Sequence, residues 1–230
     1  MSKWSFTSLA STGYGSNAAA MPAAESRKVL NVGGNDKRIP IPGHYAGWRH
    51  DLLDIDASAR PDVLCDARQM AEKLPGGSYD AVYCSHNLEH YFVHDARKVL
   101  QGFAHILKAD GFAEIIVPDI GAVIRLIAQF DLDLADGIIE SPAGEICGRD
   151  IIYGWAQQIE QSGNDFFAHK NGFTHKSLRL MLQEAFGFVV TIPAAERLEL
   201  RALAFRQKPD AAVLARLGVA ADALAATEAQ

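Results

Sequence analysis

The sequence predicts a doubly wound α/β fold, in which helices cover a parallel sheet. Beyond Arg27, short apolar runs alternate with segments of helical spacing. Four of these runs end in glycine or polar residues, as strands do when a ligand lies beyond their carboxyl ends. A chain of 230 residues, 49% of them hydrophobic, can bury one full core and is short for two. We therefore expect one domain with an embellishment.

Seven runs have the length and composition of strands. They are KVLNV (28–32), WRHDLLDID (48–56), DVLC (62–65), YDAVYC (79–84), FAEIIVP (112–118), Phe188–Ile192 and Leu198–Arg206. Because only Ala194–Arg197 separates the last two, these are expected to form a hairpin.

Two segments have the periodicity of amphipathic helices. Ala96–Leu107 places its apolar residues on one face, which suits packing against a sheet. The segment from His175 to Phe186 is followed by Gly187, a natural helix stop. Residues 1–26 show neither periodicity and are predicted to be an N-terminal arm, and residues 209–230 to be a C-terminal tail with Ala-rich helical turns.

Composition excludes several classes of function. A net charge of -6 without a long Lys/Arg run argues against a nucleic-acid partner. The three cysteines lack CxxC spacing, so neither a disulfide framework nor a zinc site is suggested. No apolar run approaches the ~18 residues that span a bilayer, so no membrane partner is expected. We expect a soluble protein of the reduced cytoplasm; its oligomeric state is left open.

The residues at the strand ends suit a nucleoside-bearing ligand. Gly33 and Gly34 follow the first strand, where the absence of side chains lets the backbone approach a ligand or adopt positive φ. Asn35 is one of the few other residues that visit the left-handed region readily. Asp54 closes the second strand, where a carboxylate can accept hydrogen bonds from both ribose hydroxyls. A solvated acidic turn is the alternative interpretation of Asp54.

Five ordered elements, spread over residues 28–119, carry a family resemblance. They are KVLNVGG, LDID, DVLCDA, SYDAVYCSHNLEHY and HILKADGFAEIIVPD. In that order they resemble the class I S-adenosylmethionine-dependent methyltransferases of the type 11 group, with a weaker likeness over residues 169–208. The resemblance implies a Rossmann-like methyltransferase fold over residues 27–208, with a mostly parallel seven-stranded sheet, a C-terminal antiparallel hairpin and S-adenosylmethionine as cofactor.

The resemblance also implies which residues hold the cofactor. These are Asn31, Gly33, Gly34, Asn35, Asp54, Ile55, Asp66, Ala67, Ser85 and His86. Ile55 would pack on the adenine face, and Asp66 with Ala67 would contact the adenine amino group. Asn31 departs from the family pattern, which has an acid there. For Asp66 a helix cap is the alternative role.

His86 is the candidate for chemistry, because an imidazole with a pKa near 6.5 can take a proton from a hydroxyl or amine. A purely structural role is the alternative. Glu89 and His90 complete the L-E-H signature of the family and are expected to be architectural, with His90 also a candidate for contact with the substrate.

The segment 119–173 is long for an ordinary connection and follows a strand next to the expected cleft, so we interpret it as a lid that selects the substrate. Its candidates for lining the substrate pocket are Tyr153, Trp155 and His169, with Phe166 and Phe167 beside them. The alternative is that these aromatic residues only fix the lid to the sheet.

The expected function is methyl transfer from S-adenosylmethionine to an oxygen or nitrogen of a small molecule or sugar, without a metal. No D/N-P-P-Y/F/W run is present, which disfavours base and amide methylation. A non-catalytic S-adenosylmethionine-binding or regulatory protein is the main alternative, and an NAD-dependent oxidoreductase is a weaker one.

Overall fold

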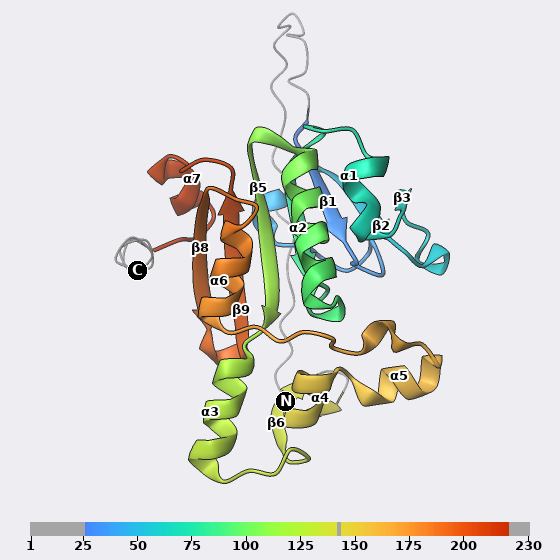
Figure 1. Cartoon of the computed structure of the whole chain (residues 1–230), viewed down its shortest axis with the longest axis vertical. Helices are drawn as coiled ribbons and strands as arrows, with labels where there is room; N and C mark the ends of the chain where they lie inside the picture. Colours follow the sequence, from blue (N-terminus) through green and yellow to red (C-terminus); the bar gives the residue numbers. More distant parts are fainter. Residues whose placement is uncertain (1–25, 142–143, 221–230) are drawn as a thin grey trace, which may run out of the picture.

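A seven-stranded sheet forms the centre of the computed structural model, which describes residues 26–141 and 144–220 (Figure 1). Its strand order is β3-β2-β1-β4-β5-β9-β8. The strands are β1 (Lys28–Val32), β2 (Arg49–Asp54), β3 (Val63–Leu64), β4 (Tyr79–Ser85), β5 (Leu107–Pro118), β8 (Phe188–Ala194) and β9 (Glu199–Phe205). Strands β1 to β5 pair in parallel, whereas β9 is antiparallel to both β5 and β8. The mostly parallel α/β fold with a C-terminal hairpin is confirmed.

The strand order reverses beside β1. The chain runs outward from β1 to β2 and β3, then returns to place β4 on the other side of β1. In open parallel sheets such a switch point opens a crevice beyond the carboxyl ends of the strands. Gly33 and Ser85 therefore lie on the two sides of one opening.

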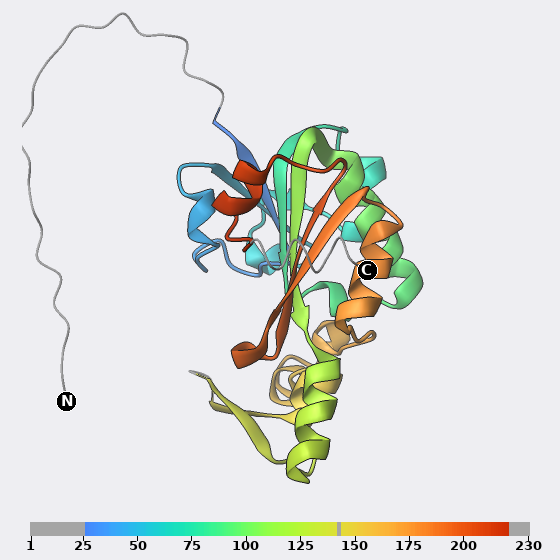
Figure 2. The same ribbon diagram turned by 90° about the vertical axis from the view of Figure 1, so that its left-hand side faces the viewer.

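One face of the sheet is covered by helices α1 (Met70–Lys73), α2 (Val93–Ile106) and α6 (His175–Gln183) (Figures 1 and 2). The stripe predicted on α2 is fully buried and includes Val99, Phe103 and Ile106. It packs in a core cluster with residues of β1, β4 and β5. The predicted helices are thus present, and both contribute to this core.

The other face differs from the expected pattern, because no α-helix connects β1 to β2. Residues 33–48 form a loop that contains only a 3-10 turn, Gly43–Tyr45. Pro40 and Pro42 explain this, since proline lacks a backbone donor and breaks a helix interior. This face of the sheet is instead covered by Tyr45, which is almost fully buried, and by α7 (Ala211–Arg216) of the predicted tail.

A buried carboxylate anchors this loop. Glu114 of β5 is 1% exposed, and its Oε2 accepts a hydrogen bond of 2.8 Å from the Tyr45 hydroxyl. His44 Nε2 lies 2.8 Å from the same oxygen, and Arg201 Nε of β9 donates to Oε1 at 2.6 Å. Because a buried charge is stable only when it is paired and hydrogen-bonded, these contacts fix the loop on the sheet.

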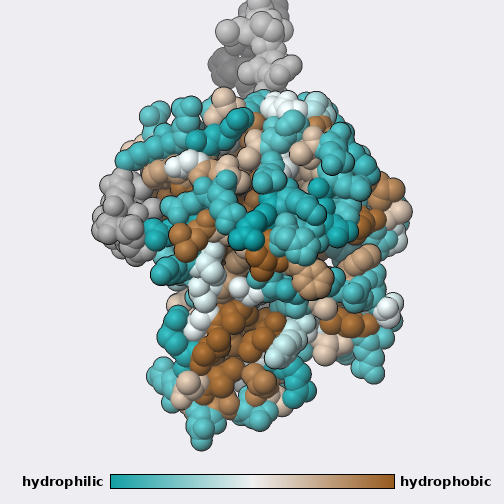
Figure 3. Space-filling model, in the orientation of Figure 1, coloured by the Kyte–Doolittle hydropathy of each residue, from teal (hydrophilic) through white to brown (hydrophobic). Residues whose placement is uncertain are grey.

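The insertion between β5 and α6 projects beyond the carboxyl edge of the sheet (Figures 1 and 2). It contains α3 (Ile120–Phe130), the hairpin of β6 (Gly137–Ser141) and β7 (Gly144–Cys147), α4 (Gly148–Tyr153) and α5 (Ala156–Ser162). Its two ends meet where Asp119 forms an isolated bridge with Phe173. Figure 3 shows apolar side chains gathered on its surface, and Ile124 and Phe130 of α3 are exposed.

Residues 1–25 of the predicted arm lie outside the described residues. Within the described part of the chain, the helices are all too short or too polar to cross a membrane.

Candidate functional site

A cleft of about 350 Å³ lies at the carboxyl ends of β1, β2 and β4. The predicted cofactor residues that line it are Asn31, Gly33, Gly34, Asn35, Asp54, Ile55, Ser85 and His86. His90 lines it as well. Its volume falls within the roughly 300–1,000 Å³ of ligand sites. The topology therefore brings together residues that are spread over three strand ends.

The loop after β1 requires both of its glycines. Gly33 has a φ of 70°, and a Cβ there would lie 2.1 Å from Nδ2 of Asn87. Gly34 has no positive φ, but a Cβ there would lie 2.2 Å from Nδ2 of Asn31. Asn35 adopts the left-handed conformation expected of it, with a φ of 57°. Asn31 is buried, and its side-chain amide packs against Gly34. Asn31, which stands where the family pattern has an acid, therefore has a structural role in this loop.

Asp54 points its carboxylate to the cleft and also organises the surrounding backbone. Its Oδ2 accepts a hydrogen bond from the Asn35 N–H at 3.2 Å, and its Oδ1 accepts one from the Asp56 N–H at 2.9 Å. A carboxylate has about four acceptor positions, so each oxygen keeps capacity for a ligand hydroxyl. This arrangement is suited to a pair of neighbouring hydroxyls, as on a ribose.

Asp66 and Ala67 do not line the cleft. Asp66 caps a 3-10 turn by accepting from the Arg68 N–H, and its Oδ2 lies 2.6 Å from Nη2 of Arg68. Asp66 instead lines a smaller hollow of about 150 Å³, which it shares with Ile55 and His90. Ala67 is buried. The structure therefore shows Asp66 in the alternative role of a cap. The hollow that Asp66 lines shares Ile55 and His90 with the cleft, so the two spaces are neighbours.

His86 follows β4 in an unusual conformation and lies between two carboxylates. Its φ is 48°, in the left-handed region, where non-glycine residues are uncommon and often functional. Nε2 lies 2.9 Å from Oε1 of Glu199, and Nδ1 lies 3.5 Å from Oε1 of Glu89. Partial burial lowers the pKa of His86, but the hydrogen bond to Glu199 and the nearby charge of Glu89 outweigh it and raise the pKa to about 10. In this arrangement the imidazole is protonated at neutral pH.

A second cavity of about 720 Å³ lies between the sheet edge and the insertion. Trp155 and His169 line it, and so does Glu199. Tyr153 lines neither cavity and is 61% exposed. His86, His90 and Phe167 line both cavities, so the two spaces meet at these residues.

Sequence reasoning missed several lining residues. Glu199 starts β9, and no local pattern relates it to His86, which lies 113 residues earlier. Residues 39–41 also line the cleft, because the loop without a helix folds over it. Asn164 reaches the cleft from the insertion as well, beside Phe166, which was expected to line the substrate pocket. The aromatic content of the insertion was the only sequence signal for this contact.

Comparison with known proteins gives one family match. Residues 12–115, a little under half of the chain, match the family model described as a methyltransferase domain. No curated protein matches the sequence significantly.

Several solved structures are similar to this one. A S-adenosylmethionine-dependent methyltransferase from Methanosarcina mazei shares 12% identity over 80% of this chain and 95% of its own, with a TM-score of 0.49. A second, from Archaeoglobus fulgidus, is 15% identical in sequence, and the match covers 78% of this chain and 86% of that chain, with a TM-score of 0.45. A third is the 1,6-didemethyltoxoflavin-N1-methyltransferase from Burkholderia thailandensis, with bound 1,6-didemethyltoxoflavin and S-adenosylhomocysteine. It is 16% identical in sequence, and the match covers 81% of this chain and 72% of that chain, with a TM-score of 0.45. At these identities and TM-scores the likenesses carry no information about the acceptor.

The family match covers most of the segment whose residues first indicated the family, and it is consistent with a class I S-adenosylmethionine-dependent methyltransferase.

Proposed function

We propose that this protein transfers the methyl group of S-adenosylmethionine to an oxygen or nitrogen of a small molecule or sugar. The observation that carries the proposal is the meeting of two cavities at His86, His90 and Phe167. A transfer between two bound molecules requires such a junction, because the acceptor atom has to reach the methyl carbon in line.

The cleft fits the adenosyl donor by the chemistry of its lining. The Asp54 carboxylate has free acceptor positions for the ribose hydroxyls. Ile55 is 47% exposed beside it and offers an apolar surface for the purine. Asn87 Oδ1 is buried without a hydrogen-bond partner among the described residues, and Asn87 lines the same cleft. Such a group is suited to the polar methionine end of the donor.

S-adenosylmethionine, when bound, supplies a methyl group on a sulfonium, and the acceptor's lone pair forms the new bond while the C–S electron pair stays on sulfur. The protein's contribution is to position the acceptor and exclude water, which can be worth about 7–11 kcal/mol in favourable cases. We assign the acceptor's proton to His86. An acceptor that inserts between His86 and Glu199 would remove one of the two carboxylate contacts that hold the proton on the imidazole, so the pKa of His86 would fall and the neutral ring could accept the acceptor's proton, while the contact with Glu89 stays in place.

The insertion is assigned to acceptor selection. Trp155, Ile151 and Phe167 give the second cavity apolar walls, whereas Glu199 and Arg197 give it charged groups. A pocket with mainly apolar walls and a few polar groups is typical of small-molecule sites.

The test begins with calorimetric binding of S-adenosylhomocysteine to the purified protein, followed by a screen of hydroxyl and amine acceptors with labelled donor. We expect donor-site binding and transfer to at least one acceptor. His86→Ala should lower kcat far more than it weakens S-adenosylhomocysteine binding. Binding without any transfer would instead support the non-catalytic alternative, and an equal loss of both quantities in the variant would assign His86 a structural role.

A further inference from the structure

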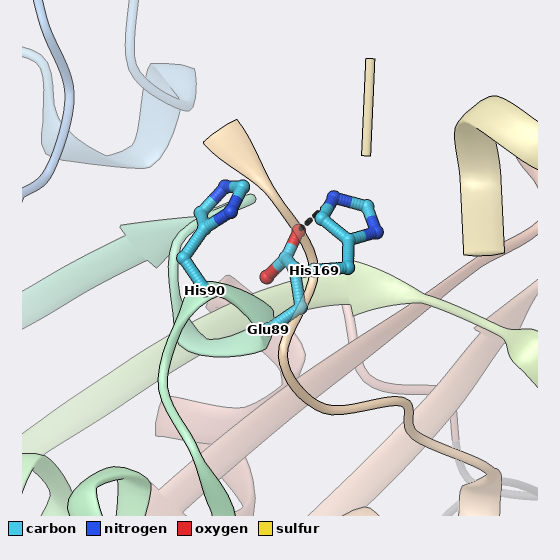
Figure 4. Close-up of side chains that lie close together, drawn as sticks. All are labelled: Glu89, His90 and His169. Carbon is cyan, nitrogen blue, oxygen red and sulfur yellow. Dashed lines mark ion pairs between the residues drawn. The ribbon is translucent and has the colours of Figure 1, made fainter. Parts of the chain in front are cut away.

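Three side chains with metal-ligating atoms converge beneath the second cavity. Glu89 and His90 belong to the 3-10 turn that follows β4, and His169 belongs to the returning end of the insertion. One ligand atom from each lies within 4.8 Å of the other two. Figure 4 shows the two imidazole rings on either side of the Glu89 carboxylate. The ring centroids are 5.0 Å apart.

Glu89 is a buried carboxylate that lacks hydrogen bonds. Its side chain is 1% exposed, and neither Oε1 nor Oε2 accepts a hydrogen bond from the described residues. Its backbone is held in place, because its carbonyl accepts from the N–H groups of Lys170 and Asn171 at 2.9 and 3.1 Å. A buried ionised carboxylate is costly unless a cation or several donors compensate it. The position of Glu89 therefore calls for a positive charge.

His169 has the arrangement of a metal-binding histidine. Its Nδ1 lies 2.9 Å from the carbonyl oxygen of Ile151, to which it donates in the corresponding tautomer. Its Nε2 then carries a lone pair and faces Oε1 of Glu89 at 4.0 Å. Ligating histidines usually donate their second ring N–H to a carbonyl or carboxylate, which fixes the tautomer and the ring.

His90 contributes a second imidazole nitrogen. Its Nδ1 lies 3.2 Å from the carbonyl oxygen of Ala168, and its Nε2 lies 3.1 Å from that of His86. A neutral imidazole has one N–H, so only one of these contacts is then a hydrogen bond. The other nitrogen directs its lone pair at an oxygen, and a cation would be a better partner for it.

We propose that Glu89, His90 and His169 bind a divalent transition-metal ion of the zinc class at the floor of the second cavity. Two imidazoles and one carboxylate are a common set for a zinc ion that keeps its fourth position open. Ligands about 2.1 Å from a tetrahedral ion lie roughly 3.4 Å from one another, so the three side chains have to draw together slightly. His90 and His169 line the cavity while Glu89 lies behind them, so the open position faces the cavity.

An ion here would connect the sheet to the insertion, since two ligands follow β4 and the third ends the insertion. Its open position would take an oxygen of the acceptor and lower the pKa of that hydroxyl. This role rests on the proposed function, whereas ion binding itself does not. His86 is the competing cation, because its Nδ1 lies 3.5 Å from the same Glu89 oxygen.

The experiment is calorimetric titration of the chelator-treated full-length protein with zinc chloride, with magnesium chloride in parallel. We expect one zinc ion per chain and much weaker binding of magnesium, which prefers oxygen ligands. Glu89→Gln and His169→Ala should each weaken zinc binding at least tenfold. His94→Ala is the matched control, because His94 is an exposed histidine of α2 outside the cluster. Its zinc affinity should equal that of the unaltered chain.

Absent stoichiometric binding would overturn the proposal, as would affinity unchanged in both cluster variants, which would locate the ion elsewhere. If Glu89→Gln does not fold, His169→Ala carries the test, with cobalt(II) absorption reporting tetrahedral histidine ligation. S-adenosylhomocysteine binding is measured on the same preparations. Zinc binding without S-adenosylhomocysteine binding would refute the donor site alone, and the reverse result would refute the metal site alone.

Discussion

Replacing Asp54 with alanine is the sharpest test of the donor site. The Asp54 carboxylate accepts from the N–H groups of Asn35 and Asp56 and keeps one acceptor position on each oxygen for the ribose. A hydrogen bond to a charged group contributes about 1.5–3 kcal/mol. Loss of two such bonds should weaken binding by about 3 kcal/mol or more, which corresponds to roughly a hundredfold change in Kd.

The assay is calorimetric titration with S-adenosylhomocysteine. Asp54→Asn keeps the shape and one acceptor oxygen, so its affinity should lie between those of the alanine variant and the unaltered chain. Asp36→Ala is the control, because Asp36 belongs to the same loop but does not line the cleft, and its carboxylate pairs with Arg38. Its Kd should change little. If the Asp54→Ala protein remains folded and its Kd for S-adenosylhomocysteine is within twofold of that of the unaltered chain, the assignment of Asp54 to the ribose is refuted.

Three further predictions concern the loop and the two cavities. Gly34→Ala should reduce the free energy of unfolding, measured in urea, by about 1–3 kcal/mol, because the added methyl group overlaps the Asn31 amide. Adding Asn31→Ala to the same chain should recover part of this loss. Tyr45→Phe should cost about 2 kcal/mol in the same measurement by removing a donor from buried Glu114, and an unchanged midpoint would contradict the anchoring role. Trp155→Ala should raise KM for the acceptor without changing S-adenosylhomocysteine affinity, because Trp155 lines only the second cavity; weakened donor binding would speak against two separate subsites.

The elements that follow from local pattern could be predicted from the sequence. KVLNV corresponds to β1 with the same bounds, and Asn35 adopts the left-handed conformation that its residue type favours. The carboxyl ends of β1, β4 and β5 lie within one residue of the predicted ends because apolar runs stop where polar residues begin, whereas β5 begins at Leu107, five residues before the predicted run. The missing helix between β1 and β2 was also accessible in principle, since Pro40 and Pro42 disfavour one there.

The contacts made by the insertion could not be predicted in this way. Glu199 meets His86, and His169 meets Glu89, only because the sheet order and the return of the insertion bring distant segments together. No residue spacing within one segment encodes such pairs. The sequence likewise left two roles open for Asp66, since a cap and a ligand contact use the same carboxylate; the structure shows the cap and the ion pair with Arg68, and the contact with the cofactor stays a prediction.

The loop that replaces a helix after β1 has a consequence for which nucleotides the cleft can accept. Dinucleotide sites place the pyrophosphate at the positive end of a helix dipole, where unpaired N–H groups point at the phosphate oxygens. In this chain the loop leads only to the short turn Gly43–Tyr45. A diphosphate group would therefore lack the partial positive charge that usually neutralises it, whereas an adenosyl sulfonium brings its own positive charge and has no phosphate to neutralise. The first crossover thus disfavours NAD and leaves adenosyl binding unaffected.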